Sequence, residues 1–375
     1  MVGVVEAMHA AIGRQILPGT PAQAILAGAT GAIYGGIRAI TRSVGGGIDA
    51  LLSPLSGAPG EAQSNPAREA MLAAINGILG DHLASTRNPL AIPMRLRHRG
   101  RPLHLERRRL KAAIPRGGGR LLVLAHGLCM NDLQWTRHGH NHGRALAADL
   151  GWTPVYLHYN TGLHVSTNGR AFAALLETLV DEWPERVREL AIVGHSSGGL
   201  LARSALHYGA AAGHRWPRLV RRLFFLGTPH HGSALERAGN WVNVMLNLTP
   251  YSSPLARIAG IRSAGITDLR YGNLVDEDWQ GTDRFHHTGD RRRPLPLPKR
   301  VRCFAIAASA DHRYRLDGRC GDGLVDVDSA LGRHPDPSLH LSFSPSRQWV
   351  GRGMGHWDLL SHPEIYGRIR EWIAS

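Results

Sequence analysis

One five-residue motif constrains the fold of this chain more than any other feature. Residues 194–198 read Gly-His-Ser-Ser-Gly, directly after the apolar run at 190–193 and directly before a helix pattern that begins at Gly199. A strand-to-helix turn of this G-x-S-x-G form strains the backbone of its central serine and exposes the hydroxyl. The motif therefore predicts Ser196 as a nucleophile, against the alternative that a glycine-rich loop merely turns the chain.

Strand and helix patterns alternate on both sides of this motif. Apolar runs typical of buried strands occupy 120–125, 153–158, 190–193, 222–226, 301–308 and 347–350. Helix patterns occupy 66–84, 145–150 and 170–183, and a last helix carries a capping box at Ser361-x-x-Glu364 and ends near Ile373. Residues 94–98 and 103–106 read as a hairpin. Continuous apolar strands that alternate with helices predict an α/β fold with a mostly parallel, helix-covered sheet.

Two segments fall outside the alternation. Residues 1–90 predict a helical N-terminal arm; the alternative for its first 60 residues is a segment that rests on lipid. Residues 91–375 form the main domain. Within it, 234–298 predict a cap insertion over the site, because an apolar helix pattern at 241–248 accompanies this long excursion; the alternative is disorder.

Composition limits the environment and the partners of the chain. The 375 residues hold 44 Lys and Arg against 29 Asp and Glu, a formal charge of +15 that favours anionic partners such as phospholipid head groups. No zinc-finger spacing or aromatic-interleaved basic patch occurs, so no nucleic acid partner is expected; most basic residues read as solvated faces. Three cysteines build no disulfide framework, and no secretory signal is recognised. We expect a cytoplasmic protein, with peripheral membrane contact as a further option.

A nucleophilic serine needs a histidine base and an acid, which follow it along the chain in this architecture. His356 lies between flanking glycines after the last strand pattern and is the preferred base, with His362 as the alternative. Asp322, immediately before Gly-Leu-Val, is the preferred acid, with Asp311 as the alternative.

The tetrahedral oxyanion of such chemistry needs backbone donors that are already in position. The amide of Ser197, directly after the nucleophile, is one expected donor. The His-Gly-Leu sequence after the strand at 120–125 suggests the amide of Leu128 as the other. We expect no cofactor and no metal. The histidines at 138, 140 and 142 have no nearby Cys or acid at metal-site spacing apart from Asp132, and they read as a polar loop.

Five ordered motifs together resemble those of α/β-hydrolases, and more narrowly those of bacterial lipases and the lipase-like domain of GPI inositol-deacylases. They cover about 94–375 and are His126-Gly127-Leu128, the 194–198 motif, Gly-Thr-Pro-His-His-Gly-Ser at 227–233, Asp322-Gly-Leu-Val and Gly355-His356-Trp357-Asp358. The resemblance implies a Ser196–Asp322–His356 triad, and it implies that His230 and His231 shape the pocket. Secreted lipases often bind calcium; Asp358 matches one such acid, but no partner for it is identified.

The expected function is therefore a serine carboxylic-ester hydrolase, of lipase or esterase type, that acts through an acyl-enzyme on an apolar acyl ester or lipid. Acyl transfer or thioester cleavage by the same triad is an alternative. A different class of alternative is a membrane-surface adaptor on a hydrolase scaffold.

Overall fold

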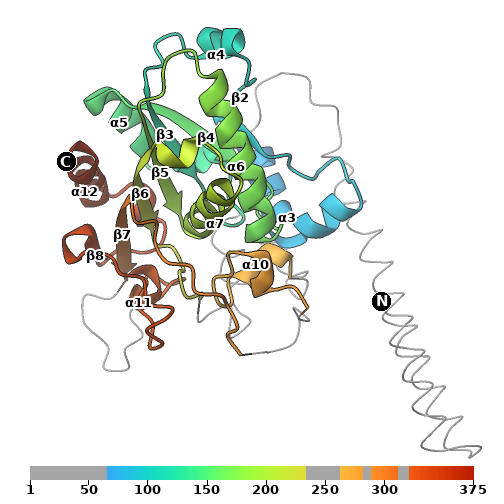
Figure 1. The fold of residues 1–375 in the computed structure, drawn as a ribbon, viewed down its shortest axis with the longest axis vertical. Coiled ribbons are helices and arrows are strands. Elements are labelled where there is room, and N and C mark those ends of the chain that lie inside the picture. Colours follow the sequence, from blue (N-terminus) through green and yellow to red (C-terminus); the bar gives the residue numbers. More distant parts are fainter. Residues whose placement is uncertain (1–65, 234–261, 282–288, 311–320) are drawn as a thin grey trace, which may run out of the picture. The chain divides into compact units, whose positions relative to one another are not determined.

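The computed structural model describes residues 66–233, 262–281, 289–310 and 321–375 (Figure 1). Residues 63–375 form one compact unit, and residues 1–62 lie outside the described residues. The predicted division of the chain at residue 90 stays a prediction. The helix at 66–85 belongs to the main unit, and the rest of the predicted arm stays a prediction.

In the described part of the chain, eight strands form a single sheet, of which six neighbouring strands run parallel. The order is β2-β1-β4-β3-β5-β6-β7-β8, and β1 pairs antiparallel with both β2 and β4. This order, with helices on both faces, is the arrangement of an α/β-hydrolase fold, which confirms the expected fold class. The strands are β1 Arg95–His98, β2 Arg101–Pro102, β3 Arg120–Ala125, β4 Thr153–His158, β5 Glu189–His195, β6 Val220–Leu226, β7 Arg302–Ser309 and β8 Gln348–Arg352.

Helices cover the two faces of this sheet. The α-helices are α3 Pro66–Ser85, α4 Arg107–Ala113, α5 His142–Leu150, α6 Val165–Glu182, α7 Ser197–Ala211, α10 Ala264–Asp268, α11 Val327–Ala330 and α12 Pro363–Ala374. Short 3-10 turns lie at η2 Asp132–Trp135, η3 Trp216–Arg218, η5 Asp276–Asp278, η6 Pro345–Arg347 and η7 Asp358–Leu360. Among the described helices, none combines the length and the apolarity that crossing a bilayer requires.

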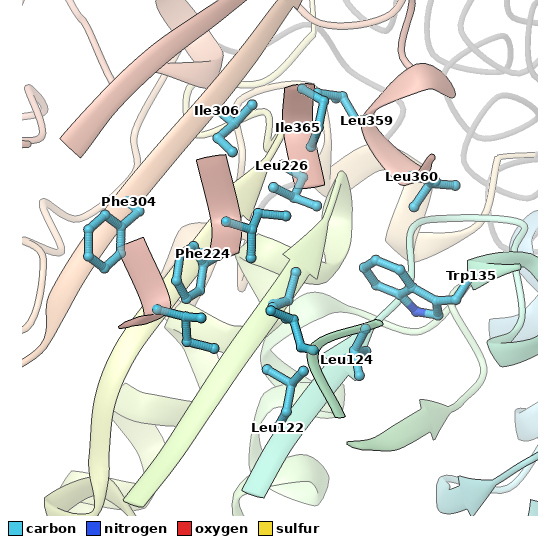
Figure 2. Close-up of a cluster of buried hydrophobic side chains, with 14 of the residues drawn as sticks. Leu122, Leu124, Trp135, Phe224, Leu226, Phe304, Ile306, Leu359, Leu360 and Ile365 are labelled. Atoms are coloured by element: carbon cyan, nitrogen blue, oxygen red, sulfur yellow. The ribbon is translucent and has the colours of Figure 1, made fainter. Parts of the chain in front are cut away.

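Strand alternation explains how the core forms. Successive side chains of a strand point to opposite faces, so in β6 Phe224 and Leu226 face α5 and α12 while Phe225 meets α7. On the α12 face, residues of β3, β5, β6 and β7 pack with Ile365 and with Trp135 of η2 (Figure 2). A sheet buried on both faces needs continuous apolar runs, which is the pattern that the sequence carries.

Four expectations about the elements need correction. The second strand of the hairpin is Arg101–Pro102 rather than 103–106, because a two-residue turn with positive φ at Arg99 and Gly100 closes it early. Helix α4 was not expected, and α6 begins at Val165 rather than 170. The last helix is capped by His362, whose side chain accepts from the Glu364 amide, and not by a Ser361 capping box.

Helix α3 packs against the loops at the carboxyl edge of the sheet. A Cβ on Gly77 would lie 2.2 Å from Cys129 Sγ, and Asn160 Nδ2 donates to the Gly80 carbonyl at 2.8 Å. Ser263, in the described part of the insertion, donates to the Gly77 carbonyl at 2.6 Å. Small residues on α3 therefore allow close approach of two loops that follow β3 and β4. The apolar helix expected at 241–248 lies outside the described residues.

Candidate active site

Ser196 lies at the sharp turn between β5 and α7. Its φ of 53° and ψ of −128° put a non-glycine residue in a region that L-amino acids rarely adopt. The turn is tight, since a Cβ on Gly194 would lie 2.6 Å from Gly199 Cα and one on Gly198 2.2 Å from the Ala125 carbonyl oxygen. The strain and the glycines around it are those expected of a nucleophile elbow. The expected exposure of the hydroxyl is wrong for this structure, in which Ser196 is buried.

Asp322 and His356 form a buried pair at the same end of the sheet. Asp322 Oδ2 lies 2.6 Å from His356 Nδ1, and both side chains are almost fully buried. Because a carboxylate only accepts, Nδ1 carries the proton and Nε2 is the nitrogen left to act as a base. The other oxygen, Oδ1, accepts from the amides of Leu324 at 2.9 Å and Val325 at 2.8 Å, which fixes the carboxylate.

The backbone around Gly227 brings the serine and the pair to one place. The Ser196 amide donates to the Leu226 carbonyl at 2.8 Å, so the elbow is tied to the end of β6. The next residue, Gly227, has a φ of 57°, and a Cβ there would lie 3.2 Å from His356 Cε1 and 3.1 Å from Asp322 Oδ2. A side chain at this position would therefore intrude on the pair.

The two expected oxyanion donors belong to segments that adjoin Ser196. The Ser197 amide opens α7, where amides have no acceptor within the helix. Gly127, in the loop that carries Leu128, approaches the serine so closely that a Cβ would lie 2.9 Å from Ser196 Cβ. Within the described residues, neither the Leu128 nor the Ser197 amide donates a hydrogen bond. Both amides are thus available for a ligand.

His195 is a contact that the motif alone did not reveal. Its Nε2 donates to the His356 carbonyl at 3.2 Å, and the two ring centroids lie 4.7 Å apart. Burial, and then the neighbouring His356, hold the pKa of His195 well below its ordinary value, so the ring is neutral. The residue before the nucleophile therefore positions the histidine loop. The sequence shows it only as a variable position of the motif.

A buried ionic network behind the oxyanion loop was also missed. Arg97 Nη1 lies 3.0 Å from Glu69 Oε2 of α3 and 3.0 Å from Asp132 Oδ1 of η2. Burial, and then Arg97, lower the pKa of His158 to about 2, so this neighbour of Glu69 is neutral. The network joins α3, β1 and the turn that follows the oxyanion loop. A basic hairpin residue and two distant acids give no sequence sign of such pairing.

The segment at 227–233 supports the acid turn rather than serving as a base. Ser233 Oγ donates to the Leu324 carbonyl at 2.6 Å, and Ser329 Oγ donates to the Gly232 carbonyl at 2.7 Å. Burial, and then Arg203, hold the pKa of His230 well below its ordinary value. These contacts fit the expectation that this segment shapes the site.

The remaining residues that the sequence analysis singled out are the alternative base and acid, the histidine cluster and Asp358. His362 caps α12, and Asp311 lies outside the described residues. His142 is buried, with Nε2 donating to the Leu359 carbonyl at 2.9 Å. Asp358 Oδ2 accepts from the Gly355 amide at 2.8 Å, inside the histidine loop. In the part of the chain that the structure describes, no group of three or more His, Cys, Asp or Glu is arranged to hold a metal ion.

Fold and site geometry together define the class: this chain has an α/β-hydrolase fold, with a buried acid–histidine pair and a strained serine turn at the same edge of the sheet. A family model described as "Domain of unknown function (DUF7379)" matches residues 97–269. No curated protein matches the chain. The narrower likeness to GPI inositol-deacylases stays a prediction.

Solved structures give further likenesses. The mature form of the Bacillus licheniformis lipase BlEst2 is 20% identical, covers 68% of this chain and 91% of its own, and has a TM-score of 0.45. The Staphylococcus hyicus lipase is 14% identical over 68% of this chain and 95% of its own, with a TM-score of 0.40. A Pyrococcus furiosus esterase is 14% identical over 69% and 82%, with a TM-score of 0.40. At these identities the assignment of a site depends on the chain's own residues.

Proposed function

We propose that this protein is a serine carboxylic-ester hydrolase in which Ser196 is the nucleophile, His356 the base and Asp322 the acid. The observation that carries the proposal is the buried Asp322–His356 pair, 2.6 Å apart, beside the strained Ser196 turn. A structural histidine would be held equally well by a carbonyl. A carboxylate fixed by two amides stabilises the imidazolium that forms when histidine takes a proton from serine.

The proposed reaction proceeds through an acyl-enzyme. His356 Nε2 takes the hydroxyl proton as Ser196 Oγ attacks the ester carbonyl, and the amides of Leu128 and Ser197 stabilise the oxyanion. The imidazolium returns the proton to the leaving alcohol. Water, activated by the same nitrogen, then releases the acid. Asp322 stays ionised and holds the Nδ1 proton throughout.

An apolar acyl group is the proposed substrate part, and a lipid ester is one such substrate. Three observations support this: Ser196 is 3% exposed, Leu128 is buried, and Met130 Sδ and Leu359 Cδ1 approach Gly127 and Gly227 respectively. Apolar surroundings favour an acyl chain over a charged group, because a charge buried there would lack a partner.

Hydrolysis of p-nitrophenyl esters of graded chain length tests the proposal. The wild-type chain is expected to hydrolyse them, Ser196→Ala to lose the activity, and the exposed control Ser346→Ala to keep it. Equal hydrolysis by Ser196→Ala and wild type would overturn the proposal, and no hydrolysis by the wild-type chain would favour the adaptor alternative. Added alcohol acceptors or thioesters extend the same assay: ester products, or faster turnover of the thioester, would identify the acyl transfer or thioesterase alternative.

A further inference from the structure

The amino edge of the sheet, opposite Ser196, carries an open hollow of about 630 Å³. Six of its seven lining side chains are arginines and the seventh is Glu189. The arginines come from the starts of β3, β5, β6 and β7 and the residues just before them: Arg120, Arg188, Arg221, Arg222, Arg300 and Arg302. Since β5 runs from Glu189 to His195, roughly 20 Å separates this edge from the elbow.

Strand register holds these cations side by side. Arg222 of β6 pairs in register with Arg302 of β7, and Arg120 of β3 with Glu189 of β5. Adjacent strands are about 4.8 Å apart, and like charges directly opposite one another destabilise a sheet. Glu189 forms an ion pair with Arg222 and offsets one charge. The rest of the positive charge in the hollow is not neutralised by its lining.

Of the six arginines, Arg222 gives the strongest indication of a missing ligand. Its side chain is 10% exposed, and within the described residues its Nε has no hydrogen-bond partner. Burial, followed by Arg302 and Arg120, lowers the pKa of Arg222 to about 10. A buried donor without an acceptor is costly unless a ligand completes it.

Some neighbouring arginines have structural partners and others do not. Arg120 Nη2 donates to the Leu150 carbonyl and Arg302 Nη1 to the Ser375 main-chain oxygen at 3.0 Å. Arg188, Arg221 and Arg300 are exposed and form no ion pair with any described residue. These three can therefore turn toward a ligand without breaking an ion pair with a described residue.

We propose that this hollow is an anion-binding site, separate from the ester-hydrolysing site, that takes a ligand bearing phosphate groups. Each guanidinium group can bind two phosphate oxygens at once. A ligand with several phosphate oxygens therefore fits a cluster of arginines better than a ligand with a single carboxylate does. The volume exceeds that of one phosphate and lies in the range of small-molecule sites. A soluble diphosphate and a phospholipid head group share this chemistry.

Calorimetric titration of the full chain with sodium pyrophosphate, and sedimentation with vesicles of equal parts phosphatidylcholine and phosphatidylglycerol, test the proposal and separate the two sources. The Arg188→Gln/Arg221→Gln/Arg300→Gln variant is expected to weaken whichever binding occurs by roughly tenfold or more. The matched control Arg109→Gln/Arg116→Gln/Arg333→Gln removes the same charge from exposed sites elsewhere and is expected to retain it.

Saturable pyrophosphate binding lost in the first variant supports a soluble ligand, and vesicle binding lost alone supports a head group. Ser196→Ala is expected to bind like wild type, which separates this site from the catalytic one. No binding of either probe, or equal weakening in both triple variants, would overturn the proposal. The single substitution Arg300→Gln repeats the test if the triple variant melts at a lower temperature than the control.

Discussion

The two edges of one parallel sheet carry opposite kinds of site. At the carboxyl edge, Ser196, Asp322 and His356 are buried, and the carboxylate is held by two amides and an imidazole. At the amino edge, arginines crowd an open hollow with one acid among them. The carboxyl edge has buried polar groups in fixed positions, which suits catalysis. At the amino edge six arginines meet one acid, and three of them, Arg188, Arg221 and Arg300, form no ion pair with a described residue, which suits recognition of an anion.

The largest expected effect is at the base of the carboxyl edge. His356→Ala is expected to lower kcat for ester hydrolysis by roughly 10⁶-fold, because serine loses its proton acceptor. Steady-state kinetics with a p-nitrophenyl ester measure this. His362→Ala is the matched control, and its kcat should stay near that of the wild type. A larger loss of kcat in His362→Ala than in His356→Ala would identify His362 as the base.

The acid of the pair comes next. Asp322→Asn keeps the shape of the side chain but removes the charge that stabilises the imidazolium, so kcat should fall by roughly 10⁴-fold. Asp328→Asn, at an exposed acid paired with Arg333, provides the control. A fall of less than tenfold in Asp322→Asn would mean that another acid serves His356.

The third prediction concerns the close approach of the oxyanion loop to Ser196. In Gly127→Ala the new methyl group would meet Ser196 Cβ, so the loop must shift and its donor must leave its position. The expected loss of kcat is roughly 10²- to 10³-fold, the cost of one oxyanion donor. Gly118→Ala meets no atom within 4 Å and should be neutral. Equal activity of both variants would remove Leu128 from the proposed hole.

Acid should destabilise the carboxyl edge through His142. Burial lowers the pKa of His142 from 6.5 to about 4. Between pH 6.5 and 4, the unfolded chain therefore binds a proton at His142 that the folded chain does not bind. Stability is therefore full above pH 6.5 and falls as the pH drops toward 4, by up to about 3 kcal/mol from this group. Urea unfolding across this range measures it. His142→Gln should flatten the slope, and an unchanged slope would contradict the assignment.

The smallest effect is expected at the amino edge. The Arg188→Gln/Arg221→Gln/Arg300→Gln variant should change the free energy of unfolding by no more than about 0.5 kcal/mol for each residue, and leave ester hydrolysis near wild type. Urea unfolding and the ester assay measure both quantities. A large loss of kcat in a folded variant would mean that the two edges are not independent.

The carboxyl edge was far more predictable from sequence than the amino edge. Buried parallel strands leave continuous apolar runs, so β3 and β4 were predicted to the residue. Glycines and a serine in fixed order marked the elbow. The packing of α3 depends on small residues that meet loops distant in sequence, and no periodicity carries that information.

The amino edge was hidden because its charges are scattered along the chain. Arg120, Arg222 and Arg302 lie at or near the starts of strands that are far apart in sequence, and only the strand order brings them together. Basic residues near 291–302 were read as solvated faces. His195 was hidden differently, since its contact with His356 depends on how two loops meet.

Mass spectrometry of the full chain after reaction with a fluorophosphonate tests the central claim most directly, because only an activated serine reacts quickly with this probe. We expect one adduct, on Ser196, that is absent from Ser196→Ala and forms much more slowly in His356→Ala. An adduct on a different residue, or ester hydrolysis that continues with Ser196 unlabelled, would contradict it.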